Sequence, residues 1–144
     1  MDKLLKLSQE HGEIFESIAF FKEAMSVARI AEEPKRLSEF NTLFQEYVAG
    51  HFHYEESKIF PLVLKSGLLE AQQVVRELQI EHIQIYAKLD LFKSLFSSSK
   101  GKPDAARMKQ IAVTAQEIIK LSLAHARKED SRFFPLVKKL NIQV

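Results

Sequence analysis

The sequence contains no cysteine among its 144 residues. This absence excludes disulfide bonds, thiolate nucleophiles, cysteine-ligated zinc and cysteine-ligated iron–sulfur clusters. Any metal site in the chain must therefore be built from histidine and carboxylate side chains. The chain offers five histidines and 19 aspartates and glutamates for this purpose.

Glycine and proline are also scarce, with four of each in the chain. Hydrophobic residues make up 46% of it, and Leu, Ala, Glu, Lys and Gln, which lose little rotamer freedom in helices, are abundant. This composition predicts an all-α protein. A length of 144 residues is typical of one domain with its own core, so we expect residues 1–144 to form a single domain.

Neither sign of charge dominates, because 21 lysines and arginines face 19 aspartates and glutamates. A broad basic surface of the kind that attracts nucleic acid or anionic lipid is therefore not expected. No stretch approaches the ~18 consecutive apolar residues of a transmembrane helix, and charges interrupt the first residues too often for a signal peptide. These absences predict a soluble, cytoplasmic protein without nucleic-acid or membrane partners.

Residues that break helices occur at three places, residues 32–34, 65–67 and 97–103. Between these breaks, apolar residues recur at the spacing of one helical face. Four helical segments joined by short connections favour antiparallel neighbours, so we predict an up-down-up-down four-helix bundle with helices of roughly 30 residues. Pro61 and Pro135 lie late in two of the segments, and we expect helix distortions near Phe60 and Phe134.

An internal repeat relates the two proline regions. The stretches at positions 51–63 and 125–137 are identical at seven of thirteen positions. Upstream of each stretch lies a Glu-His pair, at residues 10–11 and at residues 81–82. The chain therefore consists of two copies of one helical hairpin.

Each copy contains one histidine on its first helix and a His-x-x-x-Glu motif on its second. Residues four apart lie on one face of a helix, so the motif's two side chains can reach one metal centre. In an antiparallel bundle all four histidines can meet near mid-height. The predicted metal ligands are His11, His51, Glu55, His82, His125 and Glu129.

Two simpler interpretations compete with metal binding. A single histidine on an apolar helical face is often a hydrogen-bonded core residue, and a lone His-x-x-x-Glu is often a solvated helix pair. They do not account for four inward-facing histidines in a repeated arrangement, each repeat adding a carboxylate that would be costly to bury unpaired. His53 falls about 200° around the helix from His51, and we interpret it as a surface residue.

Several residues beside the predicted ligands have less certain roles. We interpret Glu56, Asp130, Glu10 and Glu81 as surface charges, with contact to the outer side of the ligands as the alternative. Tyr86 lies one turn after His82 on an apolar face. We interpret it as a core residue, with a contact to the open metal position as the alternative.

Four imidazoles and two carboxylates suit iron, manganese or zinc better than calcium or magnesium, whose sites are dominated by oxygen ligands. If both glutamates lie between two metals, each ion has two histidines and two carboxylate oxygens. This arrangement leaves room for a bridging oxygen and an exogenous ligand.

At these residues the sequence resembles the hemerythrin-like HHE cation-binding family, whose pattern is a histidine on helices one and three and His-x-x-x-Glu on helices two and four. The resemblance covers essentially the whole chain and implies a four-helix bundle with a carboxylate-bridged non-haem diiron site, in which zinc or manganese can substitute. It also implies that His11 and His51 hold the first metal and His82 and His125 the second. Oxygen-carrying members have a further histidine one turn along helix three, whereas this chain has Tyr86 after His82 and Leu78 before it.

The resemblance leaves more than one function open. The first is a diiron centre that binds or reacts with dioxygen, nitric oxide or peroxide, whether or not as an enzyme. The alternative is an iron-responsive regulatory or interaction module, in which metal occupancy stabilises the bundle and a protein partner of unknown identity responds. A metal-free structural bundle is the third.

Overall fold

The computed structural model describes residues 2–97 and 103–142, and these residues contain helices and no strand. The prediction of an all-α protein is confirmed. The third predicted break begins at Ser97, but residues 98–102 lie outside the described part of the chain. The first helix, α1 (Lys3–Ala24), begins where the Asp2 side chain accepts a hydrogen bond from the Leu4 backbone N–H.

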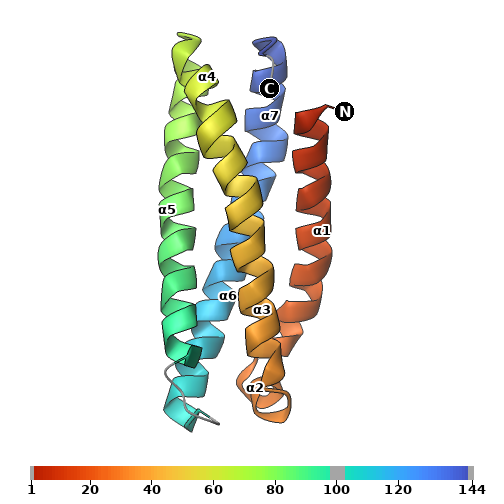
Figure 1. Ribbon diagram of the computed structural model, residues 1–144, viewed down its shortest axis with the longest axis vertical. Coiled ribbons are helices and arrows are strands. Elements are labelled where there is room, and N and C mark those ends of the chain that lie inside the picture. Colours follow the sequence, from red (N-terminus) through yellow and green to blue (C-terminus); the bar gives the residue numbers. More distant parts are fainter. Residues whose placement is uncertain (1, 98–102, 143–144) are drawn as a thin grey trace.

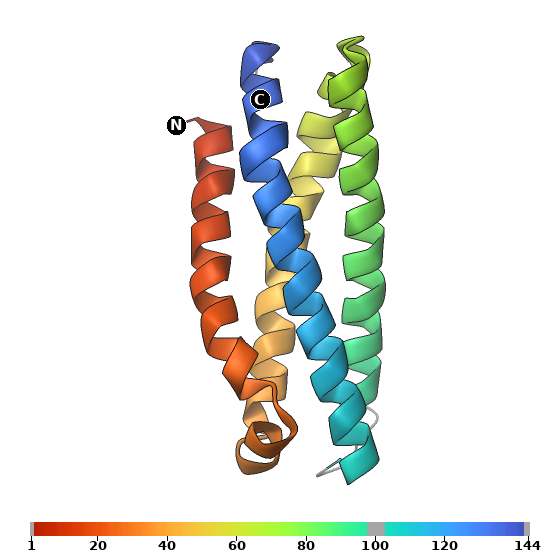
Figure 2. The same cartoon turned by 180° about the vertical axis from the view of Figure 1, so that it is seen from behind.

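Three of the other elements are π-helices, which are named η. The elements after α1 are α2 (Val27–Glu32), α3 (Lys35–Tyr47), η1 (Val48–Phe52), η2 (Glu55–Ile59), α4 (Phe60–Lys65), α5 (Leu69–Ser97), α6 (Ala105–Lys128), η3 (Glu129–Phe133) and α7 (Phe134–Lys139). Figure 1 shows α1, α3, α5 and α6 running roughly parallel to the long axis, with α4 continuing the line of α3 and α7 that of α6. The view from behind shows the same arrangement, with α2 at the end opposite the two termini (Figure 2).

The first segment differs from its prediction, because it is two helices and not one helix of roughly 30 residues. The chain turns at Met25 and Ser26, and the extended Ser26 caps α2 by accepting a hydrogen bond from the Arg29 backbone N–H. The Met25 side chain is fully buried at this turn. Serine here supplies a cap, a role that the helical periodicity of the segment does not reveal.

The predicted distortions before the two prolines are confirmed, and both are single π-helical turns. The Phe60 N–H bonds to the Glu55 carbonyl and the Phe134 N–H to the Glu129 carbonyl, each five residues back. A proline ring clashes with the carbonyl four residues before it, and a widened turn relieves that clash. Each widened turn begins at a predicted ligand, so the prolines influence where those carboxylates point. A third π-helical turn, η1, is not followed directly by a proline.

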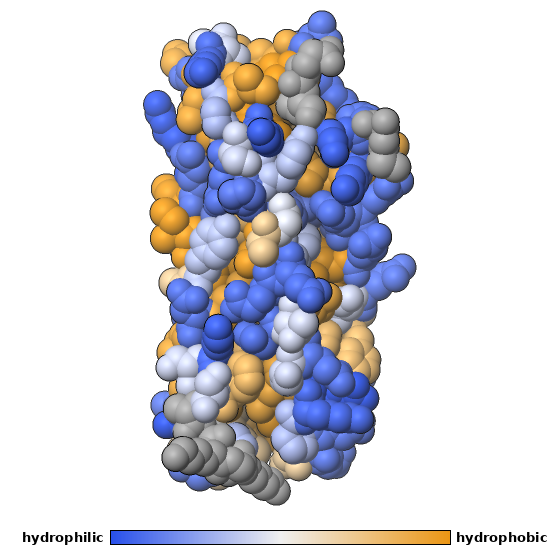
Figure 3. All heavy atoms as spheres, viewed as in Figure 1, coloured by the Kyte–Doolittle hydropathy of each residue, from blue (hydrophilic) through white to orange (hydrophobic). Residues whose placement is uncertain are grey.

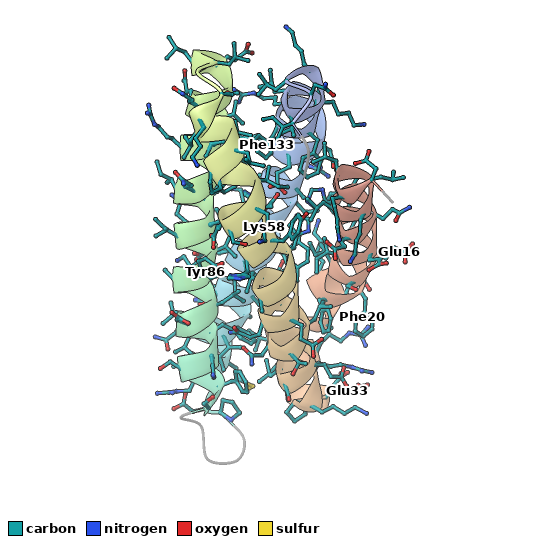
Figure 4. The ribbon with its side chains drawn as sticks, turned by 45° about the horizontal axis from the view of Figure 1, so that its top comes forward. Glu16, Phe20, Glu33, Lys58, Tyr86 and Phe133 are labelled. Atoms are coloured by element: carbon teal, nitrogen blue, oxygen red, sulfur yellow. The ribbon has the colours of Figure 1, made fainter. Side chains whose placement is uncertain are left out.

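The apolar core has two parts with a polar layer between them. On α1, Leu4 and Leu7 belong to one part, Ile14 and Ile18 belong to the other, and His11 lies between them. The other helices repeat this order, with Phe133 packed inside between the helices at one end of the molecule (Figure 4). The predicted ligands thus lie in a layer enclosed by apolar side chains from both ends.

The face shown in Figure 3 is mostly hydrophilic, with hydrophobic atoms showing along the side occupied by α5. Ile80 and Ile83 on α5 are 57% and 67% exposed. Among the described residues, no helix is long and apolar enough to cross a membrane.

Candidate metal centre

The structure brings the six predicted ligand residues together in the polar layer. All six are at least 98% buried. Two overlapping groups each place one ligand atom per residue within 4.8 Å of the others, the first formed by His11, His51 and Glu129 and the second by Glu55, His82, His125 and Glu129. His53, in contrast, is exposed, which confirms its interpretation as a surface residue.

The four imidazoles form two pairs. The Nε2 atoms of His11 and His51 are 3.0 Å apart, and those of His82 and His125 are 3.1 Å apart. Each pair joins the two helices of one sequence repeat. The two hairpins therefore each present a pair of ring nitrogens to the interior.

The two buried glutamates extend from one histidine pair to the other. Glu55 places Oε2 3.6 Å from His51 Nε2 and Oε1 3.3 Å from His82 Nε2. Glu129 places Oε1 2.9 Å from His11 Nε2 and Oε2 3.6 Å from His125 Nε2. Both carboxylates are thus placed to bridge two ions.

Four further carboxylates, those of Glu10, Glu56, Glu81 and Asp130, contact the outer nitrogen of the histidines while staying partly exposed, so the structure supports the alternative of contact with the outer side of the predicted ligands. The Nδ1 to oxygen distances are 2.9 Å for His11 and Asp130, 3.1 Å for His51 and Glu10, 2.6 Å for His82 and Glu56, and 2.8 Å for His125 and Glu81. A residue 100° around a helix from the interior lies at the edge of the buried face, where it can stay partly exposed and still contact the neighbouring helix.

These contacts determine which ring nitrogen is available to a metal. An ionised carboxylate only accepts hydrogen bonds, so each Nδ1 donates and carries the proton of the neutral imidazole. The lone pair is then on Nε2, which points to the interior in all four histidines. A carboxylate on the outer nitrogen is the usual support of a metal-binding histidine, since it orients the ring and increases its basicity.

The pattern of these contacts follows the internal repeat. Glu10 and Glu81 support the second histidine of their own hairpin, while Glu56 and Asp130 each support the first histidine of the other hairpin. The signal in the sequence was an acidic neighbour beside a ligand at all four places. Which histidine each of these carboxylates contacts depends on the arrangement of the helices, which the sequence does not show.

Aromatic rings enclose the histidines. Phe52 stacks on His82 with ring centroids 3.9 Å apart and planes 2° apart, and Phe134 stacks on His11 at 5.6 Å. Tyr86 packs against the core, and its hydroxyl donates to Glu56 Oε1 at 3.3 Å. This geometry favours the core interpretation of Tyr86 and ties its phenol to the support of His82.

Electrostatics in the layer favour a bound cation. Burial and the neighbouring charge of Glu129 raise the pKa of Glu55 well above its usual value. Burial acts on Glu129 in the same direction, but Glu55 and the nearby histidines outweigh it and lower the pKa of Glu129 well below its usual value. Without a cation, the two carboxylates therefore do not readily ionise together.

The pKa values of His51 and His82 shift in opposite directions in the metal-free protein. Burial opposes protonation of His51, yet Glu129 and Glu55 outweigh it and raise its pKa to about 10. Burial lowers the pKa of His82, despite its hydrogen bond to Glu56. In the metal-free protein, a protonated His51 places a positive charge beside the buried carboxylates. A bound metal ion would supply that charge in its place.

The residues present fit a metal. Within the described part of the chain, both oxygens of Glu55 and Oε2 of Glu129 are buried and have no hydrogen-bond partner. Such groups are costly to bury in native proteins. Coordination to a cation between the histidine pairs would satisfy them.

Comparison with known families agrees with this chemistry. The chain matches the hemerythrin HHE cation binding domain model over residues 3–137, nearly its whole length. Searches of curated proteins and of solved structures return no significant match.

Proposed function

The chain belongs to the hemerythrin HHE cation-binding family, and from this premise we propose that its buried cluster is a carboxylate-bridged non-haem diiron centre. His11 and His51 hold the first ion, and His82 and His125 hold the second. Glu55 and Glu129 bridge the two. The proposal includes an up-down-up-down four-helix bundle, in which α3 to α4 and α6 to α7 each count as one helix interrupted by π turns.

One observation carries this proposal. Three carboxylate oxygens, from Glu55 and Glu129, lie buried and unpartnered beside four Nε2 atoms whose rings are oriented by hydrogen bonds from Nδ1. A structural bundle gains nothing from such an arrangement, because unpaired buried carboxylates destabilise it. A pair of divalent cations neutralises them.

The donor set indicates which metal and which ligands. Four nitrogens and two carboxylates suit iron, with zinc or manganese as substitutes, and leave coordination positions open on each ion. When bound, iron supplies redox-active centres that coordinate and exchange electrons with a small molecule. The ligand residues are at least 98% buried, which favours molecules as small as dioxygen, nitric oxide or peroxide. The phenol of Tyr86 contacts Glu56 and leaves the open positions free.

The test is metal content with optical spectroscopy. Protein purified from iron-replete cells, or reconstituted under nitrogen with ferrous iron, is expected to hold two irons per chain. Exposure to dioxygen or nitric oxide should then produce charge-transfer bands. Trace iron after both procedures would contradict the diiron centre, while two irons without any spectral change would contradict ligand reactivity alone.

A variant and a matched control separate the site from the fold. Glu55→Ala combined with Glu129→Ala should remove iron binding and leave the helical circular dichroism spectrum unchanged. Glu16→Ala is the control, because Glu16 is exposed and lies on the outward side of α1 (Figure 4). Equal iron content in both variants would contradict the assignment of the bridging residues.

The buried carboxylates also favour a second candidate, an iron-responsive regulatory or interaction module. Because the metal-free centre is electrostatically costly, metal occupancy should strongly stabilise the bundle, and a protein partner could respond to that stability. A large rise in melting temperature with iron, together with no reaction toward dioxygen, nitric oxide or peroxide, would favour this function over ligand chemistry.

A further inference from the structure

A groove on the surface leads to the first histidine pair. It lies between α1 and α3, has a volume of about 330 Å³, and its lining includes Glu10, Tyr47, Gly50 and His51. His51 is 2% exposed and forms the inner limit of this groove. The groove therefore connects solvent with the edge of a proposed ligand.

The charge of the groove is negative. Its lining contains the carboxylates of Glu10, Glu13 and Glu46 and contains no lysine or arginine. Glu13 and Glu46 are exposed near its mouth, and neither forms an ion pair with another described residue. Glu10 lies deeper and contacts His51 at 3.1 Å. Clefts lined by one sign of charge concentrate ions of the opposite sign.

Aromatic rings cover both histidine pairs, with Phe134 on His11 and Tyr47 on His51 in the first, but the charge beside the second pair differs. Phe52, which is fully buried, covers the face of His82, and Phe60 lies 5.4 Å from the same ring. On the other side Lys128 forms an ion pair with Glu81, the carboxylate that supports His125. The positive charge of Lys128 repels an approaching metal ion, whereas the negative charge of the groove attracts one.

We propose that metal cations enter and leave the centre through the groove between α1 and α3, so that the ion at His11 and His51 exchanges much faster than the ion at His82 and His125. This inference rests on the proposed metal centre, which it deepens by assigning a route and an order of exchange. Metal ions approach through the acidic groove. The ion at His11 and His51 exchanges with solvent, and the ion at His82 and His125 is retained.

Gly50 provides a way to block the route. A Cβ atom built on Gly50 meets nothing within 4 Å, and its backbone has no positive φ, so a larger side chain can occupy the groove without backbone strain. Gly12 is a matched control, because it also has open space, is exposed, and neighbours a histidine of the same pair. Gly12 does not line the groove.

The experiment follows Co(II) binding to the metal-free full chain and its release into excess chelator, by visible absorption in stopped flow. The unaltered protein should bind two equivalents and release them in two phases of equal amplitude. Gly50→Phe should slow uptake and the fast release by about tenfold, because the ring must move before an ion can pass. Gly12→Phe should keep both rates of the unaltered protein, and both variants should still bind two equivalents.

Each outcome is informative. Release in one phase, or equal rates in Gly50→Phe and Gly12→Phe, would overturn the route while the two bound equivalents upheld the metal centre. Failure of the unaltered protein to bind cobalt would overturn both. If Gly50→Phe does not fold, as judged by circular dichroism, the double variant Glu13→Gln with Glu46→Gln provides the test. It should slow uptake by about threefold at low salt and not at high salt, and unchanged uptake at low salt would overturn the route.

Discussion

The two halves of the centre have matching ligands and different surroundings. Each hairpin presents two histidines, one buried glutamate and a π turn that begins at that glutamate, and each histidine donates from Nδ1 to a carboxylate. Beyond the carboxylates the halves diverge. Asp130 also accepts a hydrogen bond from Ser8 and Glu10 lines an open groove, whereas Glu56 is bonded by Tyr86 and Glu81 by Lys128.

This difference shows that the repeat places the same histidines and glutamate in both halves, while the outer contacts give each histidine pair its own environment. Position 54 in the first hairpin corresponds to Lys128 in the second, and it holds a tyrosine without charge. This difference between the copies places the Lys128 ammonium beside Glu81, the carboxylate that contacts His125. The predictions below test how far the two positions differ.

The bridging glutamates should give the largest contrast. Both glutamates reach both histidine pairs, but Glu129 lies 2.9 Å from His11 and 3.2 Å from His51, whereas Glu55 approaches that pair only at 3.6 Å from His51. Glu129→Ala should therefore lose both ions, and Glu55→Ala should keep one at His11 and His51. Metal content by mass spectrometry measures this difference. Equal loss in the two variants would show that the positions are not independent.

Removal of metal should lower stability by the next largest amount. With free metal at about a thousand times its dissociation constant, binding to the native state alone contributes about 4 kcal/mol, or on the order of 10 °C in melting temperature. Glu55→Gln should raise the melting temperature of the metal-free protein, because it removes a buried, unpartnered carboxylate. Thermal melts with and without chelator measure both effects, and a metal-free protein as stable as the loaded one would contradict the first.

The supporting carboxylates should have intermediate effects, each on one position. Glu81→Ala should weaken the ion at His82 and His125, and Glu10→Ala the ion at His11 and His51, by about 10- to 100-fold in affinity. Competition with a chelator of known affinity resolves the two binding steps. Equal weakening of both steps by either variant would break the distinction between the halves.

Tyr86 should contribute the least, through its hydrogen bond to Glu56. Burial and the nearby Glu56 raise the pKa of Tyr86 from 10.0 to about 12. The folded state thus holds the phenol proton more tightly than the unfolded state does. The resulting contribution to the free energy of unfolding is complete below pH 10 and is lost as the pH rises toward 12. Tyr86→Phe should flatten that part of the pH dependence, as measured by urea unfolding. Parallel curves for the two proteins would contradict it.

Helical periodicity, the repeat and the two prolines were enough to predict the all-α class, the six side chains that the structure brings together in the polar layer, and the distortions before Pro61 and Pro135. They succeeded because buried faces recur at a fixed spacing and because His-x-x-x-Glu places two side chains on one face. The break at Met25 and Ser26 was missed, since a serine that caps a helix looks locally like any polar residue in it.

The sequence by itself determined the all-α class, the absence of thiol ligands and the histidines and glutamates of the proposed centre, because these depend on residue identity and on spacing along one helix. Only the tertiary structure decided how the two halves differ. The supports from Glu10, Glu56, Glu81 and Asp130, the groove beside His51 and the cover of Phe52 over His82 all join different helices. Such contacts depend on which faces of neighbouring helices meet, and the periodicity of a single helix does not contain that information.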